Sequence, residues 1–189
     1  MIFTRAQEDF VTRLTVNGCK LDQVPVTKIL DVWVSQDLSW GKNTSEMCRK
    51  AYSRVSMLTK LKYVGVSEED LIEIFVLFIR SVLEYCAVAF HSSLTVEQAT
   101  DIERVQKTCL RIILGDSYVS YIAALEMCGL QTLHDRREKR CLDFAVKCTK
   151  HPVNKRLFPL NRNLDNNVNN VRSREMSAIP FCQRKLNYH

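Results

Sequence analysis

Five segments between residues 44 and 150 repeat apolar residues at steps of three and four, the spacing that gives an α-helix one apolar face. The first segment, from about Thr44 to Val64, is followed by Gly65, a residue that commonly ends helices. The other four run from Ser67 to about Leu83, from Thr95 to Gly115, from Tyr121 to Cys128, and from Thr132 to about Lys150, before Pro152. These segments predict a mainly α fold, a bundle of about five helices.

The second segment is the most apolar of the five, so we expect it to be the most buried. It begins with Ser67 as an N-cap, and the acidic run Glu68–Asp70 favours the positive end of a helix macrodipole. Its expected inward positions are Leu71, Ile74, Phe75, Phe78, Ile79, Val82 and Leu83. The third segment starts with a capping box formed by Thr95 and Gln98.

The amino-terminal part has a different pattern, which predicts strands. Asn17-Gly18 tolerates positive φ at both central turn positions and favours a two-residue hairpin between Phe10–Val16 and Cys19–Val24. The run Lys28–Ser35 is rich in β-branched and aromatic residues and predicts a third strand. We therefore expect a small β-hairpin and one further strand before the helices.

The excess positive charge lies in the tail. The whole chain carries 27 Lys and Arg against 21 Asp and Glu. Residues 150–189 hold eight basic and two acidic residues, which leaves 27 − 8 = 19 basic and 21 − 2 = 19 acidic residues in the rest. Asn161–Asn170 contains six Asn and has no apolar period, so we expect a flexible, basic, Asn-rich tail. Such a tail favours an anionic partner without identifying one.

Several classes of protein are disfavoured by the sequence. Met1–Phe10 carries charged residues where a signal peptide needs an apolar run, and no stretch has the roughly 18 apolar residues of a membrane span. We expect an intracellular protein of the cytoplasm or nucleus, with no membrane partner and with its eight cysteines reduced. Cys141 and Cys148 share a helical face with Phe144 and Ala145, which indicates core thiols rather than metal ligands.

Catalytic chemistry is not indicated. Polymerases hold two metal ions on carboxylates, and the sequence contains no Asp-Asp pair. Its five Gly are scattered, so there is no loop that cradles phosphates. None of the four His residues has a neighbourhood typical of nucleophilic catalysis. We expect no enzyme activity, no cofactor and no small-molecule substrate.

Basic residues on the helices are the remaining candidates for function. Arg104, Lys107 and Arg111 lie at i, i+3 and i+7, so all three can face one strand of nucleic acid. Asp101 and Glu103 leave open the alternative of an ordinary solvated face.

A denser group of cations, Arg136, Arg137, Lys139 and Arg140, lies near the start of the fifth segment. The macrodipole disfavours cations there, which indicates an anionic partner, although Asp135, Glu138 and Asp143 offer local pairing. Arg54 falls between the apolar positions of the first segment, so its guanidinium either reaches the edge of the bundle or points at a ligand.

Several runs of residues keep an order and spacing typical of one known family. They are Lys28–Val34 with Asp37–Trp40, Arg80–Tyr85 with Ala87–His91, Ile102–Lys107 with Arg111–Gly115, Tyr121–Leu125 with Gly129–Leu133 and Arg136–Glu138, and Ala178–Phe181 with Leu186–Asn187. Together they resemble the carboxy-terminal half of non-LTR retrotransposon reverse transcriptases of the jockey-like kind. The match spans nearly the whole chain.

The resemblance implies the end of the palm with its primer-gripping strands in residues 1–38, the thumb and post-thumb helices in 39–151, and a tail in 152–189. It adds Lys28 and Trp33 to the expected nucleic-acid-binding residues. In the parent enzyme the Asp-Asp motif that binds Mg²⁺ lies before this region, so the resemblance implies a truncated, non-catalytic fragment. Asp31 stands where the family usually has Gly, a substitution expected to strain a backbone that needs either close approach or unusual dihedrals. Ile122 stands at a position that is usually polar in the family.

Two functions are therefore expected. The first is weak binding of a primer-template duplex through its backbone, using the helix cations, Lys28, Trp33 and Arg54. The second, from another class, is a helical protein-interaction module with incidental surface charge. Salt sensitivity of binding distinguishes them, because only backbone binding is strongly weakened by salt.

Overall fold

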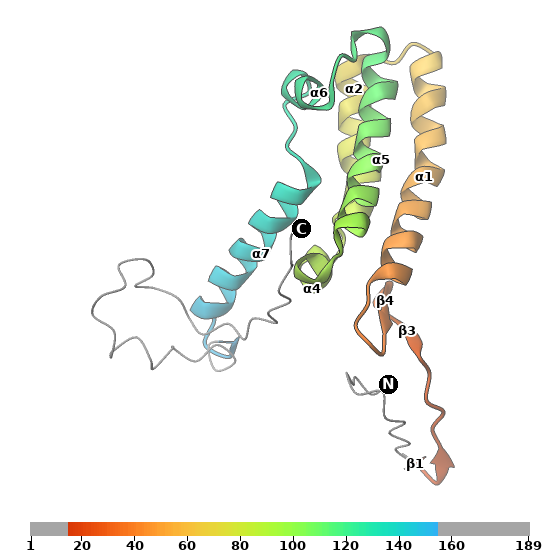
Figure 1. The fold of residues 1–189 in the computed structure, drawn as a ribbon, viewed down its shortest axis with the longest axis vertical. Helices are drawn as coiled ribbons and strands as arrows, with labels where there is room; N and C mark the ends of the chain where they lie inside the picture. Colours follow the sequence, from red (N-terminus) through yellow and green to blue (C-terminus); the bar gives the residue numbers. More distant parts are fainter. Residues whose placement is uncertain (1–14, 155–189) are drawn as a thin grey trace, which may run out of the picture. The chain divides into compact units, whose positions relative to one another are not determined.

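Three long helical segments lie side by side in the computed structural model of the chain, which describes residues 15–154 (Figure 1). The chain divides into two compact units, residues 1–140 and 141–189, with the boundary inside the last helix. The bundle of the first unit is built on α1 (Gly41–Tyr63), α2 (Glu68–Ile74) and α5 (Val96–Leu114). The predicted mainly α fold is confirmed.

Shorter elements connect and extend these helices. The π-helical segment η1 (Phe75–Arg80) and α3 (Ser81–Leu83) continue α2, and α4 (Ala87–Phe90) and η2 (His91–Ser93) lead to α5. After η3 (Gly115–Ser117) follow α6 (Tyr121–Met127) and α7 (Leu133–Lys150). All five predicted helical segments are present. The sequence did not predict that the second segment is divided into α2, η1 and α3. It did not predict the additional short helical turns either.

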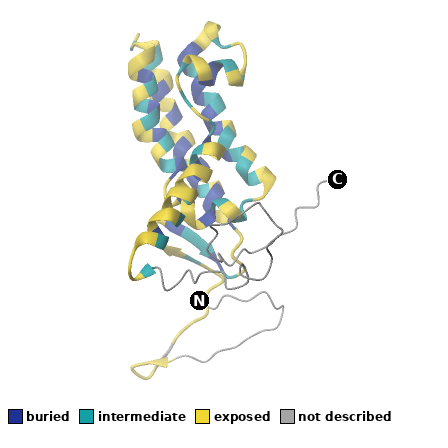
Figure 2. Cartoon of the chain, turned by 90° about the vertical axis from the view of Figure 1, so that its left-hand side faces the viewer, coloured by how far each residue is buried: buried dark blue, intermediate teal, exposed yellow. Residues whose placement is uncertain are grey.

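The core of the bundle comes from strict four-residue steps in the second segment. Leu71, Phe75, Ile79 and Leu83 are all fully buried. Figure 2 shows buried residues recurring along the long helices. In a regular α-helix a four-residue step drifts by about 40° around the axis, because 3.6 residues make a turn. The wider π-helical turn at η1 offsets this drift and keeps the four side chains in line. Phe78, predicted to point inward, is 52% exposed as a result.

Sequence-predicted caps hold the helix ends. The Ser67 hydroxyl accepts a hydrogen bond from the backbone N–H of Asp70, and Thr95 with Gln98 forms the complete capping box of α5. At the far end of α5, Leu110 and Leu114 pack with Ala124 and Leu125 of α6 in a second small core. These contacts fix α6 against α5.

Two hairpins precede the helices. β1 (Thr15–Val16) and β2 (Cys19–Lys20) pair around Asn17-Gly18, both with positive φ, so the predicted turn is confirmed, and the second strand ends at Lys20 instead of Val24. The predicted third strand is divided into β3 (Val26–Ile29) and β4 (Val32–Ser35), which pair around Leu30-Asp31. Residues 10–14 of the predicted first strand, and the predicted flexible tail from residue 155 onward, lie outside the described residues.

The turn of the second hairpin explains the unusual residue at position 31. Leu30 and Asp31 have φ of 47° and 67°, a left-handed conformation that favours glycine and tolerates Asp better than Leu. The Tyr85 hydroxyl donates a hydrogen bond to the Leu30 carbonyl at 3.0 Å, and the backbone N–H of Trp33 donates to Asn43 Oδ1 at 3.1 Å. These two bonds hold the strained turn against α1 and against the turn that follows α3.

In the second unit, the predicted core face of the last helix is only partly buried. Cys148 is buried, but Phe144 is half exposed. In the first unit, burial raises the thiol pKa of Cys48 to about 11 and that of Cys109 to about 12, so these thiols stay protonated at neutral pH. Six cysteines in the described part of the chain are free thiols: Cys19, Cys48, Cys86, Cys109, Cys128 and Cys148.

Among residues 15–154 no single helix is long and apolar enough to cross a membrane. One bent pair, residues 96–117 with 121–127, meets the length and composition requirement across a 79° break.

We expect amide hydrogen exchange to be fast at Thr15–Lys20 and slow at Leu71–Leu83. An isolated two-stranded hairpin is marginally stable, and the side chains of Thr15–Cys19 are exposed, whereas the second segment forms the centre of the core. Exchange followed by mass spectrometry or NMR measures both regions in one sample. Equal protection of the two regions would contradict the described packing.

Candidate nucleic-acid interface

Basic and aromatic side chains of the β3–β4 hairpin and α1 surround a pocket of about 320 Å³. Trp33 lies at its wall, with the Lys28 Nζ 5.8 Å and the Lys42 Nζ 5.3 Å from the centre of its ring. Lys50 and Arg54 line the same pocket. The remaining lining residues are Asp31, Val32, Asn43, Glu46, Met47, Ser81, Val82 and Tyr85.

This surface, the hairpin surface, carries net positive charge. Its cations are Lys28, Lys42, Arg49, Lys50 and Arg54, and its carboxylates are Asp31 and Glu46, which gives 5 − 2 = +3. Asp31 pairs with Lys28 and, at 2.5 Å, with Lys50. Glu46 pairs with Lys42 at 3.2 Å and Arg49 at 2.8 Å. The carboxylates therefore hold the lysines in place without neutralising the surface.

Asp31 should make the folded protein sensitive to acid. Hydrogen bonds from Lys28 and then Lys50 lower its pKa from 3.8 to about 2. A folded pKa below the unfolded one contributes stability above pH 3.8, and this contribution is lost as pH falls towards 2. Asp31→Asn should therefore be less stable than the unmodified protein above about pH 4, with the difference vanishing near pH 2.

Urea unfolding midpoints between pH 2 and 6 measure this difference. Glu69→Gln, at an exposed carboxylate on α2, serves as the control for loss of one negative charge. A stability difference for Asp31→Asn that does not change across this range would show that the two lysines do not act on the Asp31 carboxylate.

Arg54 lies at the edge of this pocket and stabilises the neighbouring helix. Its Nη1 donates a hydrogen bond to the Phe78 carbonyl in η1. A π-helical turn displaces backbone carbonyls from the regular ladder, and the guanidinium supplies a donor for one of them. Arg54 thus reaches the edge of the bundle, one of the two positions expected for it, and also lines the pocket.

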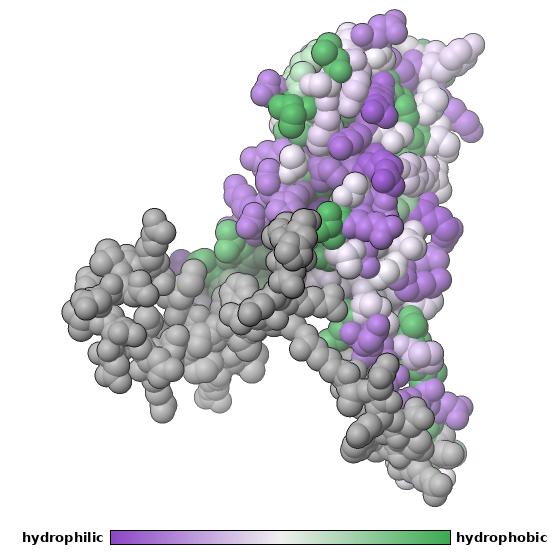
Figure 3. Space-filling view, in the orientation of Figure 1, coloured by the Kyte–Doolittle hydropathy of each residue, from purple (hydrophilic) through white to green (hydrophobic). Residues whose placement is uncertain are grey.

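The second group of predicted residues lies along α5. Arg104 Nη1 is 2.5 Å from Asp101 Oδ1. Lys107 Nζ lies 4.9 Å from the centre of the Tyr121 ring, and the Arg111 guanidinium carbon 5.3 Å from that of Tyr118. Two of the three cations, Lys107 and Arg111, therefore make cation–π contacts with aromatic rings. In the view of Figure 3 the face over α1 and α5 is mainly hydrophilic.

Tyr121 is held by a buried hydrogen-bond network. Its hydroxyl donates to Glu103 Oε1 and accepts from Gln106 Nε2 at 2.8 Å. Glu103 Oε1 also accepts the backbone N–H of Leu133 at 3.1 Å, which joins α5 to the start of α7. Burial, and then the Glu103 hydrogen bond, raise the pKa of Tyr121 well above its ordinary value. Glu103 is therefore a structural acceptor, and its charge is directed inward.

The third predicted group is not an open cationic surface. Arg137 is fully buried, so it is removed from any interface with a phosphate backbone. Arg136 Nε binds Glu84 Oε1 at 2.5 Å and Arg140 Nη2 binds Glu84 Oε2 at 3.0 Å. The sequence suggested local partners on the same helix, whereas the partner used by Arg136, Glu84, is 52 residues away.

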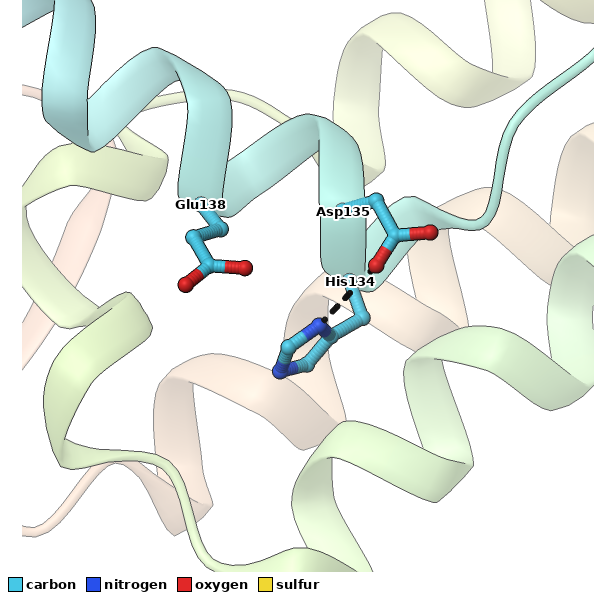
Figure 4. A group of neighbouring side chains, drawn as sticks. All are labelled: His134, Asp135 and Glu138. Carbon is cyan, nitrogen blue, oxygen red and sulfur yellow. Dashed lines mark hydrogen bonds and ion pairs between the residues drawn. The ribbon is translucent and has the colours of Figure 1, made fainter.

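One group of side chains on α7 offers metal ligands. His134, Asp135 and Glu138 are exposed, and a ligand atom from each lies within 4.8 Å of the others (Figure 4). They lie in the first two turns of α7, where the macrodipole and the neighbouring Arg136 disfavour a cation. The arrangement therefore does not favour a metal site, and the His134 ring instead packs edge-on against that of His91, at 5.3 Å.

Four residues of the candidate interface were not predicted from the sequence: Lys42, Lys50, Tyr118 and Tyr121. A signal for the first two was present, because Lys42, Glu46, Lys50 and Arg54 recur every four residues on α1. The tyrosines had no such signal, since their positions depend on how α6 folds back on α5.

Comparison with models of known families, with curated proteins and with solved structures found no match.

Proposed function

We propose that this chain holds a nucleic-acid duplex by its sugar-phosphate backbone and does not itself catalyse a reaction, the role of a thumb in the reverse transcriptases that its sequence resembles. The observation that carries the proposal is the hairpin surface, where Lys28 and Lys42 flank Trp33 and Lys50 and Arg54 line the adjoining pocket.

The composition of this surface suits a nucleic acid. Lysine and arginine neutralise phosphates, and an aromatic ring provides a stacking face for a base or sugar that any sequence can use. Lys107 on Tyr121 and Arg111 on Tyr118 repeat the combination of cation and ring on α5. Contacts of this kind position a duplex and carry little sequence information.

The absence of catalysis rests on the sequence. Two-metal polymerisation requires paired carboxylates, and the chain has no Asp-Asp motif. Magnesium would act in the parent enzyme of the resemblance, through ligands that this chain lacks. We therefore infer a binding role alone, with a primer-template of RNA and DNA as the partner.

A specific observation favours the alternative, a protein-interaction module. Leu77 and Phe78 are 57% and 52% exposed on η1, although both are large and apolar. Exposed apolar side chains next to one another can mark a protein contact. Binding that is insensitive to salt and abolished by Leu77→Ser would favour this alternative.

The proposal predicts weak, salt-dependent binding of a hybrid duplex. We expect a Kd of about 10⁻⁴ to 10⁻⁶ M at physiological salt, rising steeply with salt and independent of duplex sequence. Fluorescence anisotropy with a labelled RNA–DNA hybrid measures it. Because the tail is basic, a variant lacking residues 152–189 must retain part of the affinity. Complete loss in a folded variant would assign all binding to the tail.

A further inference from the structure

Two arginines of α7 bind one buried carboxylate, Glu84, which directly follows α3, and Arg80 of η1 lies close enough to interact with all three charges. Glu84 has a side chain that is only 2% exposed, and Arg136 and Arg140 both bind it. Arg80 precedes Glu84 by four residues, and the Glu84 backbone N–H donates to the Arg80 carbonyl, so both side chains lie on one helical face. Arg136 and Arg140 are likewise four residues apart on α7.

The Arg80 guanidinium makes no hydrogen bond or ion pair among residues 15–154, although the residue is partly buried. Burial lowers its pKa, and repulsion from Arg136 and Arg140 lowers it further, while Glu84 raises it. The charged groups that act on Arg80 are therefore two cations and one anion. A guanidinium is not discharged in such a setting, so the charge must be balanced in another way.

The charge balance of this cluster is 3 − 1 = +2. The Glu84 carboxylate accepts hydrogen bonds from Nε and Nη2 of Arg136 and pairs with Nη2 of Arg140. The backbone carbonyl of Glu84 accepts a further hydrogen bond from Arg140 Nη1. Arg136 Nη1, Arg140 Nε and the whole Arg80 guanidinium remain without a partner in the described part of the chain. These groups only donate hydrogen bonds, so a ligand that binds them must offer acceptor oxygens, and the positive balance of the cluster favours one with negative charge.

We propose that Arg80, Arg136 and Arg140 form a binding site for a phosphate-type oxyanion, with Glu84 fixing the two α7 guanidiniums in position. The Arg80 guanidinium offers a complete fork to phosphate oxygens, Arg136 and Arg140 add the N–H groups that Glu84 leaves open, and the balance of +2 matches the charge of a phosphate dianion. The Arg140 side chain is 49% exposed, so an anion reaches the site past Arg140. The site is separate from the hairpin surface and does not depend on the function proposed for it.

The ligand is either free phosphate or a phosphodiester of the nucleic-acid backbone, and two measurements on the full chain distinguish them. Titration calorimetry with inorganic phosphate, at constant ionic strength in chloride, tests the first source. Anisotropy with the hybrid duplex tests the second. The variant is Arg80→Met, which keeps the aliphatic stem and removes a repelled charge, and Lys139→Met, an exposed cation on α7, is its control.

We expect Arg80→Met to weaken binding of the ligand about tenfold or more, as expected for loss of charged hydrogen bonds, while Lys139→Met leaves it unchanged. An effect on phosphate identifies a site open to the free anion. Weaker binding of the duplex alone identifies a site that binds a phosphate of the nucleic-acid backbone. Phosphate and duplex binding that are both the same in Arg80→Met and in the unmodified chain would overturn the proposal. If Arg80→Met does not fold, Arg140→Gln at the more exposed position gives the same readout.

Discussion

Replacing Glu84 by glutamine should lower the free energy of unfolding by about 3–5 kcal/mol, as expected when one partner of a buried ion pair is removed. The amide keeps the size of the side chain but leaves Arg80, Arg136 and Arg140 together with no negative charge among them. Urea unfolding followed by circular dichroism measures the decrease.

Glu73→Gln is the control, because Glu73 lies on the same helical segment and is exposed. It should change stability by less than about 0.5 kcal/mol. A decrease of less than about 1 kcal/mol in Glu84→Gln would mean that the ion pairs with α7 are not formed in solution.

Phe75→Ala should cost about 3–5 kcal/mol, whereas Phe78→Ala should cost less than about 1 kcal/mol. Phe75 is fully buried and Phe78 is 52% exposed, although they are one turn apart and both were expected to face inward. The difference follows from the π-helical turn, which keeps the four-residue series from Leu71 to Leu83 in line. The same urea measurements test it.

The two phenylalanines are each other's control, because the chemical change is identical. Similar decreases in stability for both variants would indicate a regular α-helix in solution, with Phe78 turned toward the core. A third variant, Arg54→Met, should be less stable without any change in the core, because it removes the donor to the Phe78 carbonyl.

Much of the fold was predictable because it is encoded locally. Apolar residues at steps of three and four, the caps at Ser67 and Thr95, and Gly65 and Gly115 at helix ends predicted five helical segments close to their observed bounds. Asn17-Gly18 predicted its turn for the same reason. Each of these signals acts between residues that are close in sequence.

Other features depend on distant contacts and could not be predicted. Leu30-Asp31 is a poor sequence for a turn with positive φ, and it is held there by Tyr85, far along the chain. The apolar run from Lys28 to Ser35 was therefore interpreted as one strand. The π-helical turn likewise depends on packing and on Arg54 rather than on a local motif.

The candidate site also has some features that the sequence predicts and others that depend on distant contacts. The periodicity of α5 placed Arg104, Lys107 and Arg111 on one helix, but the rings beside two of them come from later segments. Only local partners on the same helix were predicted for Arg136 and Arg140, because Glu84 cannot be recognised as their partner from sequence. Arg80 was missed altogether, since a single arginine in an apolar helix gives no pattern.

The central claim is that the hairpin surface contacts phosphates, and the salt dependence of duplex binding in the full chain tests it most directly. Lys42→Gln with Lys50→Gln removes two of its cations, and Lys60→Gln with Lys139→Gln removes two exposed cations elsewhere, so both variants have the same net charge. The slope of log affinity against log salt should become shallower by about 0.7–0.9 for each phosphate that is no longer neutralised, and only in the first variant. The same slope in both folded variants would contradict the account.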